Sequence, residues 1–153
     1  MNKLLALIAF TSILVTTPAF AADPIVGTWK LNAAKSKFAA GGELTAATRT
    51  YSESNGTYTL KQSTTAADGK TSSSTAQYHD GAEVKQPAGA VADSVVAKKT
   101  DANTWDFDLK KGGKTVGHVH RTVSADGKTL TVQQSGARLG GGTGDETLVF
   151  DRQ

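Results

Sequence analysis

The sequence predicts an all-β fold, an antiparallel up-and-down barrel of about eight to ten strands with little helix. Turn dipeptides recur along the chain, separated by short stretches rich in Thr, Val, Tyr and Ser. Asn-Gly and Asp-Gly accept the positive φ angles of tight hairpins, and their spacing of about 8 to 12 residues is typical of antiparallel strands joined in sequence. Closure into a barrel removes the edges that an open sheet exposes, so we favour a barrel over a two-sheet sandwich. The dipeptides are Asn55-Gly56, Asp68-Gly69, Asp80-Gly81, Gly112-Gly113 and Asp126-Gly127.

About ten strands follow from these turns and from the β-branched and aromatic stretches between them. We expect them to begin near Ile25, Thr45, Thr57, Lys70, Glu83, Ser94, Thr104, Lys114, Thr129 and Glu146. The alternation is cleanest where Trp105, Phe107 and Leu109 take every second position, which gives that strand one apolar face. Helix is expected at residues 32–38 at most, for one or two turns, because no segment shows a long i, i+3, i+4 apolar spacing.

The first 21 residues have the features of a secretory signal peptide and are left out of the predicted fold. Residues 1–3 form a short basic start, residues 4–15 an apolar run, and residues 19–21 an A-x-A cleavage site that ends at Ala21. A membrane anchor is the alternative, but an apolar run of about twelve residues is too short to span a bilayer, which takes about twenty. We therefore expect residues 22–153 to form one soluble domain, exported to the periplasm or the extracellular space of a bacterium, with no membrane span.

The composition fits one domain held together by a hydrophobic core and by sheet hydrogen bonds. The 153 residues are 38% hydrophobic, 20% charged and 7% aromatic, and they include no Cys, so neither a disulfide nor a lipid-modified cysteine is available. Removal of Lys3 with the signal peptide leaves 16 basic and 14 acidic residues, a net charge of +2. The basic pairs Lys98-Lys99 and Lys110-Lys111 stand apart from each other, so no nucleic-acid partner is expected.

The start of the mature chain, G-T-W-K-L at residues 27–31, resembles the G-x-W-K-L opening of lipocalin-like calycins, most closely that of fatty-acid-binding proteins. The chain also resembles exported bacterial proteins with the motifs G-T-W-K-L-N, K-S-K-F and D-G-K-T-L, which stand here at residues 27–32, 35–38 and 126–130. The resemblance covers both ends of the mature chain. In calycins the tryptophan closes the base of the barrel against a basic residue near the end of the chain, which implies structural roles for Gly27, Trp29 and Arg152.

Fatty-acid-binding proteins hold a carboxylate with an arginine on a late strand and with an arginine and a tyrosine two apart on the last strand. By this resemblance Arg121 lies near the first position, whereas Leu148 and Phe150 take the other two, so most of that clamp is missing. On its own strand Arg121 shares a face with Val119 and Val123, the more apolar face, which we expect to point inward. A guanidinium there needs a counter-charge or several acceptors, and an anionic ligand, an internal acid or exposure to solvent are open alternatives.

Metal binding and catalysis have little support in the sequence. His118 and His120 lie two apart on a predicted strand, close enough to share a metal ion with His79 as a third ligand, but such spacing is common on a solvent-facing strand. We therefore predict neither a metal site nor a cofactor. The chain has no G-x-S-x-G motif, no Cys nucleophile and no His placed beside an evident Ser and carboxylate, so no catalytic residue is expected.

These observations predict a small exported barrel, a monomer, that binds a small and partly apolar ligand in its interior and catalyses no reaction. An anionic group on that ligand is one option. Arg121 is the expected polar anchor. The expected wall residues are Tyr51, Tyr58, Trp105 and Phe107. The alternative is an envelope structural or protein-interaction module whose barrel is packed by its own side chains. One form of that alternative is an inhibitor of a foreign enzyme, with the loops near Arg138 as its contact.

Overall fold

The computed structural model describes residues 22–138 and 141–153, and the predicted signal peptide lies outside them. The described residues form ten strands and one short 3-10 helix, which confirms the all-β prediction. Each strand begins within two residues of its predicted start, because the hairpin turns that set the boundaries were visible in the sequence. The elements are β1 (Gly27–Leu31), η1 (Ala33–Lys35), β2 (Leu44–Ser54), β3 (Thr57–Ala66), β4 (Thr71–Tyr78), β5 (Glu83–Lys85), β6 (Ser94–Lys99), β7 (Thr104–Lys111), β8 (Lys114–Val123), β9 (Thr129–Gly136) and β10 (Glu146–Arg152).

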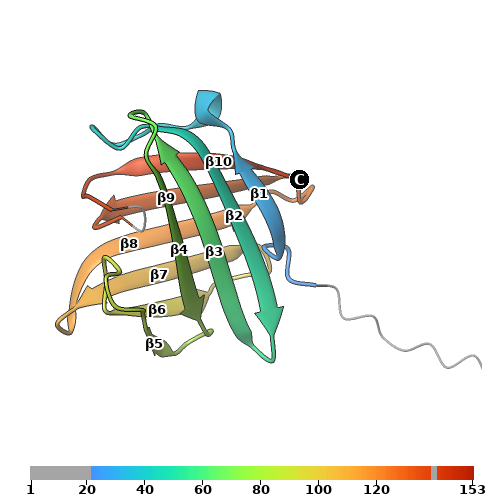
Figure 1. Ribbon diagram of the computed structural model, residues 1–153. Coiled ribbons are helices and arrows are strands. Elements are labelled where there is room, and N and C mark those ends of the chain that lie inside the picture. The colour runs from blue at the N-terminus through green and yellow to red at the C-terminus, as the bar shows by residue number, and fades with distance from the viewer. Residues whose placement is uncertain (1–21, 139–140) are drawn as a thin grey trace, which may run out of the picture.

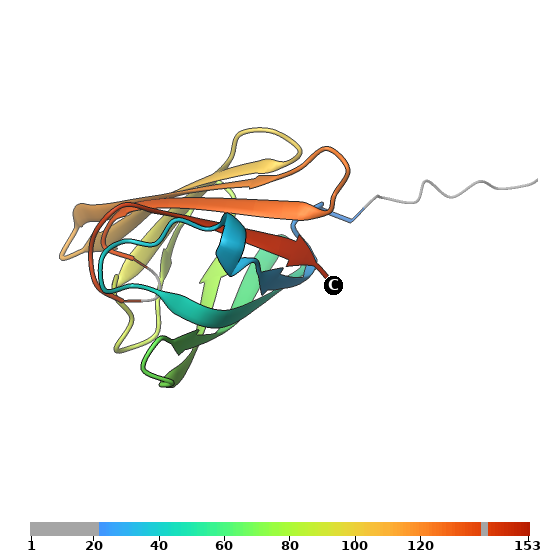
Figure 2. The same cartoon turned by 90° about the horizontal axis from the view of Figure 1, so that it is seen from above.

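All ten strands belong to one antiparallel sheet that curves into a nearly closed barrel. Their order is β4-β3-β2-β1-β10-β9-β8-β7-β6-β5, so consecutive strands pair, except β4 with β5, and β1 pairs with β10. In Figure 1 the strands β1–β4 cross in front of β6–β9. Figure 2 shows the same strands from above, wrapped around a common centre. The two ends of the order, β4 and β5, meet at a seam, across which Nε2 of Gln86 donates a hydrogen bond to the Gln77 carbonyl at 2.9 Å.

Strand alternation directs one face of each strand into the barrel. On β7 the side chains of Trp105 and Phe107 are buried, and on β8 those of Val119 and Arg121 are buried, as the sequence pattern predicts. Buried apolar side chains from β1–β4 and β6–β10 form one core cluster. The alternation of side chains along each strand therefore decides which of them meet inside the barrel. On β8 it places the charged Arg121 in the interior together with apolar side chains.

Helix is confined to one turn, η1, in the connection between β1 and β2. The side-chain oxygen of Asn32 accepts a hydrogen bond from the backbone N–H of Lys35 at 3.2 Å, which caps that turn. This agrees with the prediction of one or two turns at residues 32–38. In the part of the chain that the structure describes, no helix has the length and apolar character needed to cross a bilayer.

The base of the barrel is closed around Trp29 on β1, whose side chain is fully buried at 0% exposure. The indole N–H of Trp29 donates a hydrogen bond to the Ile25 carbonyl at 2.9 Å. On β10, the guanidinium carbon of Arg152 lies 4.3 Å from the centre of the Trp29 ring. The cation therefore covers one face of the indole, the arrangement that the calycin resemblance implies.

Arg152 also ties two separate segments of backbone together. Its Nε donates to the Gly127 carbonyl at 2.6 Å, and its two terminal nitrogens donate to the carbonyls of Val26 and Pro24. Gly27 has φ of 138°, and a Cβ atom at this position would lie 2.7 Å from a terminal nitrogen of Arg152. The glycine of the G-x-W pattern therefore leaves room for the arginine that covers the tryptophan.

We predict that Trp29→Ala lowers the free energy of unfolding by about 3 to 5 kcal/mol, because it removes a large buried side chain and leaves a cavity. Urea denaturation followed by circular dichroism measures this change. Lys30→Ala is the control, since Lys30 is the exposed neighbour on the same strand, and its effect should stay within about 0.5 kcal/mol. Similar losses for the two variants would contradict the role assigned to Trp29.

Candidate ligand-binding site

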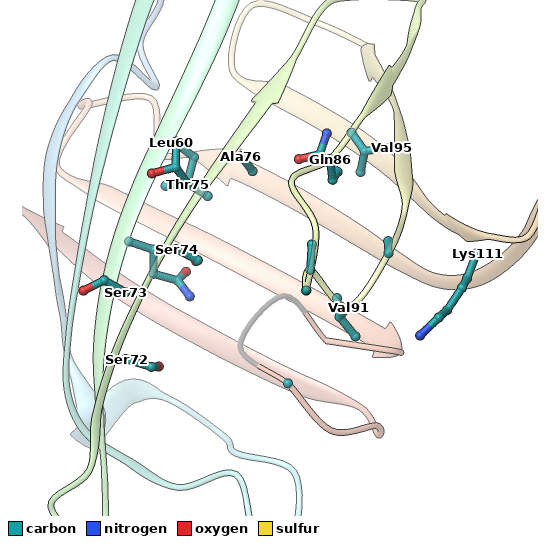
Figure 3. Close-up of a pocket in the computed structure, with 15 residues that line it drawn as sticks. Leu60, Ser72, Ser73, Ser74, Thr75, Ala76, Gln86, Val91, Val95 and Lys111 are labelled. Carbon is teal, nitrogen blue, oxygen red and sulfur yellow. The ribbon is translucent and has the colours of Figure 1, made fainter.

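A pocket of about 460 Å³ opens beside the seam between β4 and β5. Figure 3 shows Ser72, Ser73 and Ser74 of β4 along one wall, and Val91 and Val95 on the opposite wall, which belongs to the segment after β5 and to β6. The hydroxyl groups of β4 thus face small apolar side chains, so the lining suits a molecule that has both polar and apolar parts. The lining residues are Leu60, Gln62, Ser72, Ser73, Ser74, Thr75, Ala76, Gln86, Gly89, Ala90, Val91, Ala92, Val95, Lys111 and Gly141.

One pocket residue, Gln62 of β3, connects the pocket with a buried arginine. The side-chain oxygen of Gln62 accepts a hydrogen bond from Nε of Arg49 at 2.7 Å. Arg49, on β2, is 2% exposed, and its guanidinium carbon lies 4.7 Å from the centre of the Phe150 ring. Burial lowers the pKa of Arg49 from its ordinary value, an effect that Tyr51 partly offsets and the positive charge of Arg121 reinforces. A dehydrated cation therefore lies directly behind the pocket wall.

A second buried arginine, Arg121 of β8, lies among aromatic rings. Its guanidinium carbon is 4.0 Å from the centre of the Phe107 ring, 5.5 Å from that of Tyr51 and 5.7 Å from that of Tyr78. Such rings attract a cation through their negative faces but supply no hydrogen-bond acceptor in the plane of the guanidinium. Nε and one terminal nitrogen of Arg121 are buried without a hydrogen-bond partner among the described residues.

An aromatic cluster continues from Arg121 toward the N-terminal segment. The rings of Tyr58 and Tyr78 are stacked with their centres 5.2 Å apart, and Trp105 meets both rings edge-on at 4.8 and 5.2 Å. The Tyr58 hydroxyl donates to a carboxylate oxygen of Asp23 at 2.8 Å, and the Lys99 ammonium reaches the same oxygen at 2.6 Å. Tyr58 is thus engaged with an internal ion pair at the edge of the cluster.

The residues predicted from the sequence to bind a ligand come together in this interior cluster, but none of them lines the pocket. They are Arg121, Tyr51, Tyr58, Trp105 and Phe107. Periodicity indicates which face of a strand points inward, but it does not indicate where along the barrel the side chains leave open space. The pocket is lined instead by residues nearer the β4–β5 seam. The binding roles of the predicted residues stay predictions.

Sequence reasoning missed Arg49, Gln62 and Tyr78, which the structure places between the pocket and Arg121 or against Arg121 itself. A signal for Arg49 was present. Arg49 and Tyr51 are two apart on β2, the same spacing of arginine and tyrosine that the family resemblance led us to seek on the last strand. The pair lies instead two strands away from β10 in the sheet order, with β1 between them.

A third buried arginine, Arg138, follows the end of β9. Arg138 is 7% exposed and forms an ion pair with Glu146, with 2.8 Å between Nη1 and Oε2. The other carboxylate oxygen of Glu146 accepts a hydrogen bond from Gln134 at 2.7 Å. A Cβ atom at Gly42 would lie 2.0 Å from the Arg138 guanidinium, so the neighbouring loop packs closely over it. The inhibitor hypothesis named the loops near Arg138 as a contact, but this side chain faces the protein interior.

The two histidines considered as metal ligands lie on the outer face of the barrel. Nδ1 of His118 is 2.7 Å from a carboxylate oxygen of Asp108, and Nδ1 of His120 is 2.6 Å from one of Asp106. Nε2 of His120 is 3.1 Å from the Thr122 hydroxyl. Across residues 22–138 and 141–153, no group of three or more His, Cys, Asp or Glu side chains is arranged to hold a metal ion.

We predict that Tyr58 and Tyr78 resist ionisation in the folded protein. Burial raises the pKa of both phenols above the ordinary value near 10, and the carboxylate of Asp23 raises that of Tyr58 further. The folded state then binds these protons more tightly than the unfolded chain, so their contribution to stability is complete below about pH 10 and is lost as the pH rises further.

Ultraviolet absorbance of tyrosinate, followed against pH in the folded protein and in urea, measures this difference. In urea all three tyrosines should titrate near pH 10, whereas in the folded protein the titration of two of them should shift to higher pH. Ionisation of all three together near pH 10 in both states would contradict the prediction.

Comparison with known proteins adds the fold context for this site. No family model matches the sequence, and no curated protein matches it significantly. Among solved structures, the fluorescent protein UnaG superposes with a TM-score of 0.60 at 16% identity, covering 87% of this chain and 100% of that one. A fatty-acid-binding protein of Schistosoma mansoni in complex with arachidonic acid gives a TM-score of 0.55 at 17% identity, covering 85% and 96% of the two chains.

The zebrafish ileal bile-acid-binding protein in complex with cholic acid superposes with a TM-score of 0.58 at 10% identity, covering 85% of this chain and 99% of that one. The last two of these neighbours are named as binding proteins. At these identities the comparison establishes the fold alone. The protein has the same barrel fold as these structures.

Proposed function

We propose that this protein is exported and binds a small, partly apolar, anionic molecule inside its barrel, without catalysing a reaction on it. The observation that carries the proposal is the pair of buried arginines, Arg49 and Arg121, which have no carboxylate partner among the described residues. Removing a cation from water without a counter-charge costs several kcal/mol, on the order of what a ligand anion can offset. Gln62 links Arg49 to the pocket, so an anion that enters there comes within reach of the first of the two arginines.

The pocket supports the apolar part of the proposal. Leu60, Ala76, Val91 and Val95 give it apolar surface, and the serines of β4 add hydroxyl groups at one wall. Two structural neighbours were solved with arachidonic acid and with cholic acid, molecules that join an acid group to an apolar body. We infer that the ligand of this protein has the same general build, with its acid group toward the arginines and its apolar part in the pocket.

A protein-interaction module with a packed barrel is the competing hypothesis, and ligand extraction separates the two. The mature protein is purified natively from the exported fraction, and its organic extract is compared with a mock purification by mass spectrometry. An acidic small molecule at near-stoichiometric amount supports the proposal. An empty extract, together with no response from fluorescent lipid probes, would favour the interaction module.

We predict that Arg121→Gln weakens the binding of decanoate by about tenfold or more, because it removes one of the two buried positive charges. Binding of decanol, which is neutral, should change little, and both affinities are measured by calorimetric titration. Lys98→Gln removes the same charge from an exposed position of β6 and serves as the control. Unchanged decanoate affinity in a folded Arg121→Gln protein would remove Arg121 from the site.

The proposal of export gives a separate prediction. The mature chain should begin at Ala22, because the A-x-A site ends at Ala21. Mass spectrometry of the intact protein from the exported fraction measures the start of the chain, and size-exclusion chromatography of the same sample tests the expected monomer. A chain that keeps residues 1–21 and stays with the membrane fraction would show that this segment is an anchor.

A further inference from the structure

The charges inside the barrel do not balance. Four residues that carry a charge are buried as a whole among those described, Arg49, Arg121, Arg138 and Glu146. The carboxylate of Asp23 is buried too, but the Lys99 ammonium at 2.6 Å balances its charge. Glu146 is already engaged, since its two carboxylate oxygens accept hydrogen bonds from Arg138 and Gln134. An arginine in a protein does not lose its proton to relieve such an imbalance. Arg49 and Arg121 therefore leave two positive charges in the interior without an ion-pair partner among the described residues, since Glu146 acts on Arg49 only at a distance.

The same region offers more hydrogen-bond donors than acceptors. Three guanidinium nitrogens of Arg49 and Arg121 are buried without a hydrogen-bond partner among the described residues. They are Nη1 of Arg49 and both Nε and Nη1 of Arg121. The hydroxyl of Tyr78 is buried without a hydrogen-bond partner among the described residues, and that of Tyr51 is buried close enough to Arg49 to act on its pKa. The Arg121 guanidinium lies beside both tyrosine rings. Arg49 and Arg121 are close enough for the charge of one to act on the other. These four residues form one donor cluster with two positive charges.

The donor cluster distinguishes between classes of acid. A carboxylate brings one negative charge and two oxygens, which leaves one of the two positive charges without a partner. A phosphate monoester brings a charge of about −1.5 to −2 at neutral pH and three strong acceptor oxygens. Building on the proposed interior binding, we propose that the head group held by the donor cluster is a phosphate monoester, attached to an apolar tail that lies in the pocket.

Gln62 marks the route by which such a head group reaches the donor cluster. Its side chain lines the pocket, and its oxygen already accepts the Nε hydrogen of Arg49 at 2.7 Å. A neutral amide oxygen satisfies that donor without neutralising the charge. An entering phosphate oxygen takes over this position and adds the missing negative charge, so the Gln62 side chain moves aside on binding.

The test compares three ligands with the same kind of tail on the mature protein by calorimetric titration: octyl phosphate, octyl sulfate and nonanoate. Near pH 7.5 octyl phosphate should bind about tenfold or more tightly than either monoanion. Near pH 5.5 this advantage should shrink by about fourfold, because the second phosphate proton has a pKa of about 6 and only about a quarter of the ligand then carries both charges. Octyl sulfate keeps one charge at both pH values and so reports any titration of the protein itself.

Gln62→Glu provides the matching variant, because it introduces a carboxylate next to Arg49. We expect it to weaken octyl phosphate binding by about tenfold or more and to raise the midpoint of thermal unfolding. Gln133→Glu makes the same chemical change at an exposed position of β9 and should alter neither property. Unchanged phosphate affinity in Gln62→Glu would overturn the placement of the head group at the donor cluster.

The outcomes separate this inference from the function on which it rests. Equal affinities for octyl phosphate and nonanoate near pH 7.5, both weakened by Arg121→Gln, would overturn the phosphate assignment and leave the proposed function in place. No detectable binding of the three anions or of decanol would instead remove interior ligand binding itself, and the phosphate assignment with it.

Discussion

The interior of this barrel is organised around positive charge that strand alternation forces inward. Arg49 and Arg121 occupy core-facing positions on β2 and β8, and their guanidinium groups lie on the rings of Phe150 and Phe107. Aromatic faces attract a cation but do not neutralise it. The packing therefore tolerates the two arginines while neither has an ion-pair partner among the described residues, and this constraint connects the core of the barrel with its proposed function.

A third arginine shows what a structural use of the same side chain looks like in this fold. Arg152 covers Trp29, and all three of its guanidinium nitrogens donate to backbone carbonyls of the loops that close the base. Arg138 is likewise matched, by Glu146. Nε of Arg138 is buried without a hydrogen-bond partner among the described residues, as are two donors of Arg121. What separates Arg121 from Arg138 is the charge, because Arg121 has no carboxylate partner among the described residues whereas Arg138 has Glu146.

The pocket and the arginines complement each other because of how the sheet ends. β4 and β5 do not pair with each other, so the small side chains of β4 line an open space instead of packing against a neighbouring strand. Gln62, on the adjacent strand β3, spans the distance from this space to Arg49. The side chain of Gln62 thus connects the pocket beside β4 with the buried guanidinium of Arg49.

The sequence by itself determined the strand boundaries and the inward faces of β7 and β8, because hairpin turns and a period of two are local properties of the chain. It also indicated Arg121, Tyr51 and the closure of the base by Trp29. It did not indicate that Arg49 meets Gln62, or where the pocket lies, since these depend on the register between β2 and β3 and on the gap beside β4. Whether an acidic side chain pairs with Arg121 also depends on the tertiary structure, because an ion pair across a barrel joins residues far apart in the chain. Among the described residues Arg121 has no such partner.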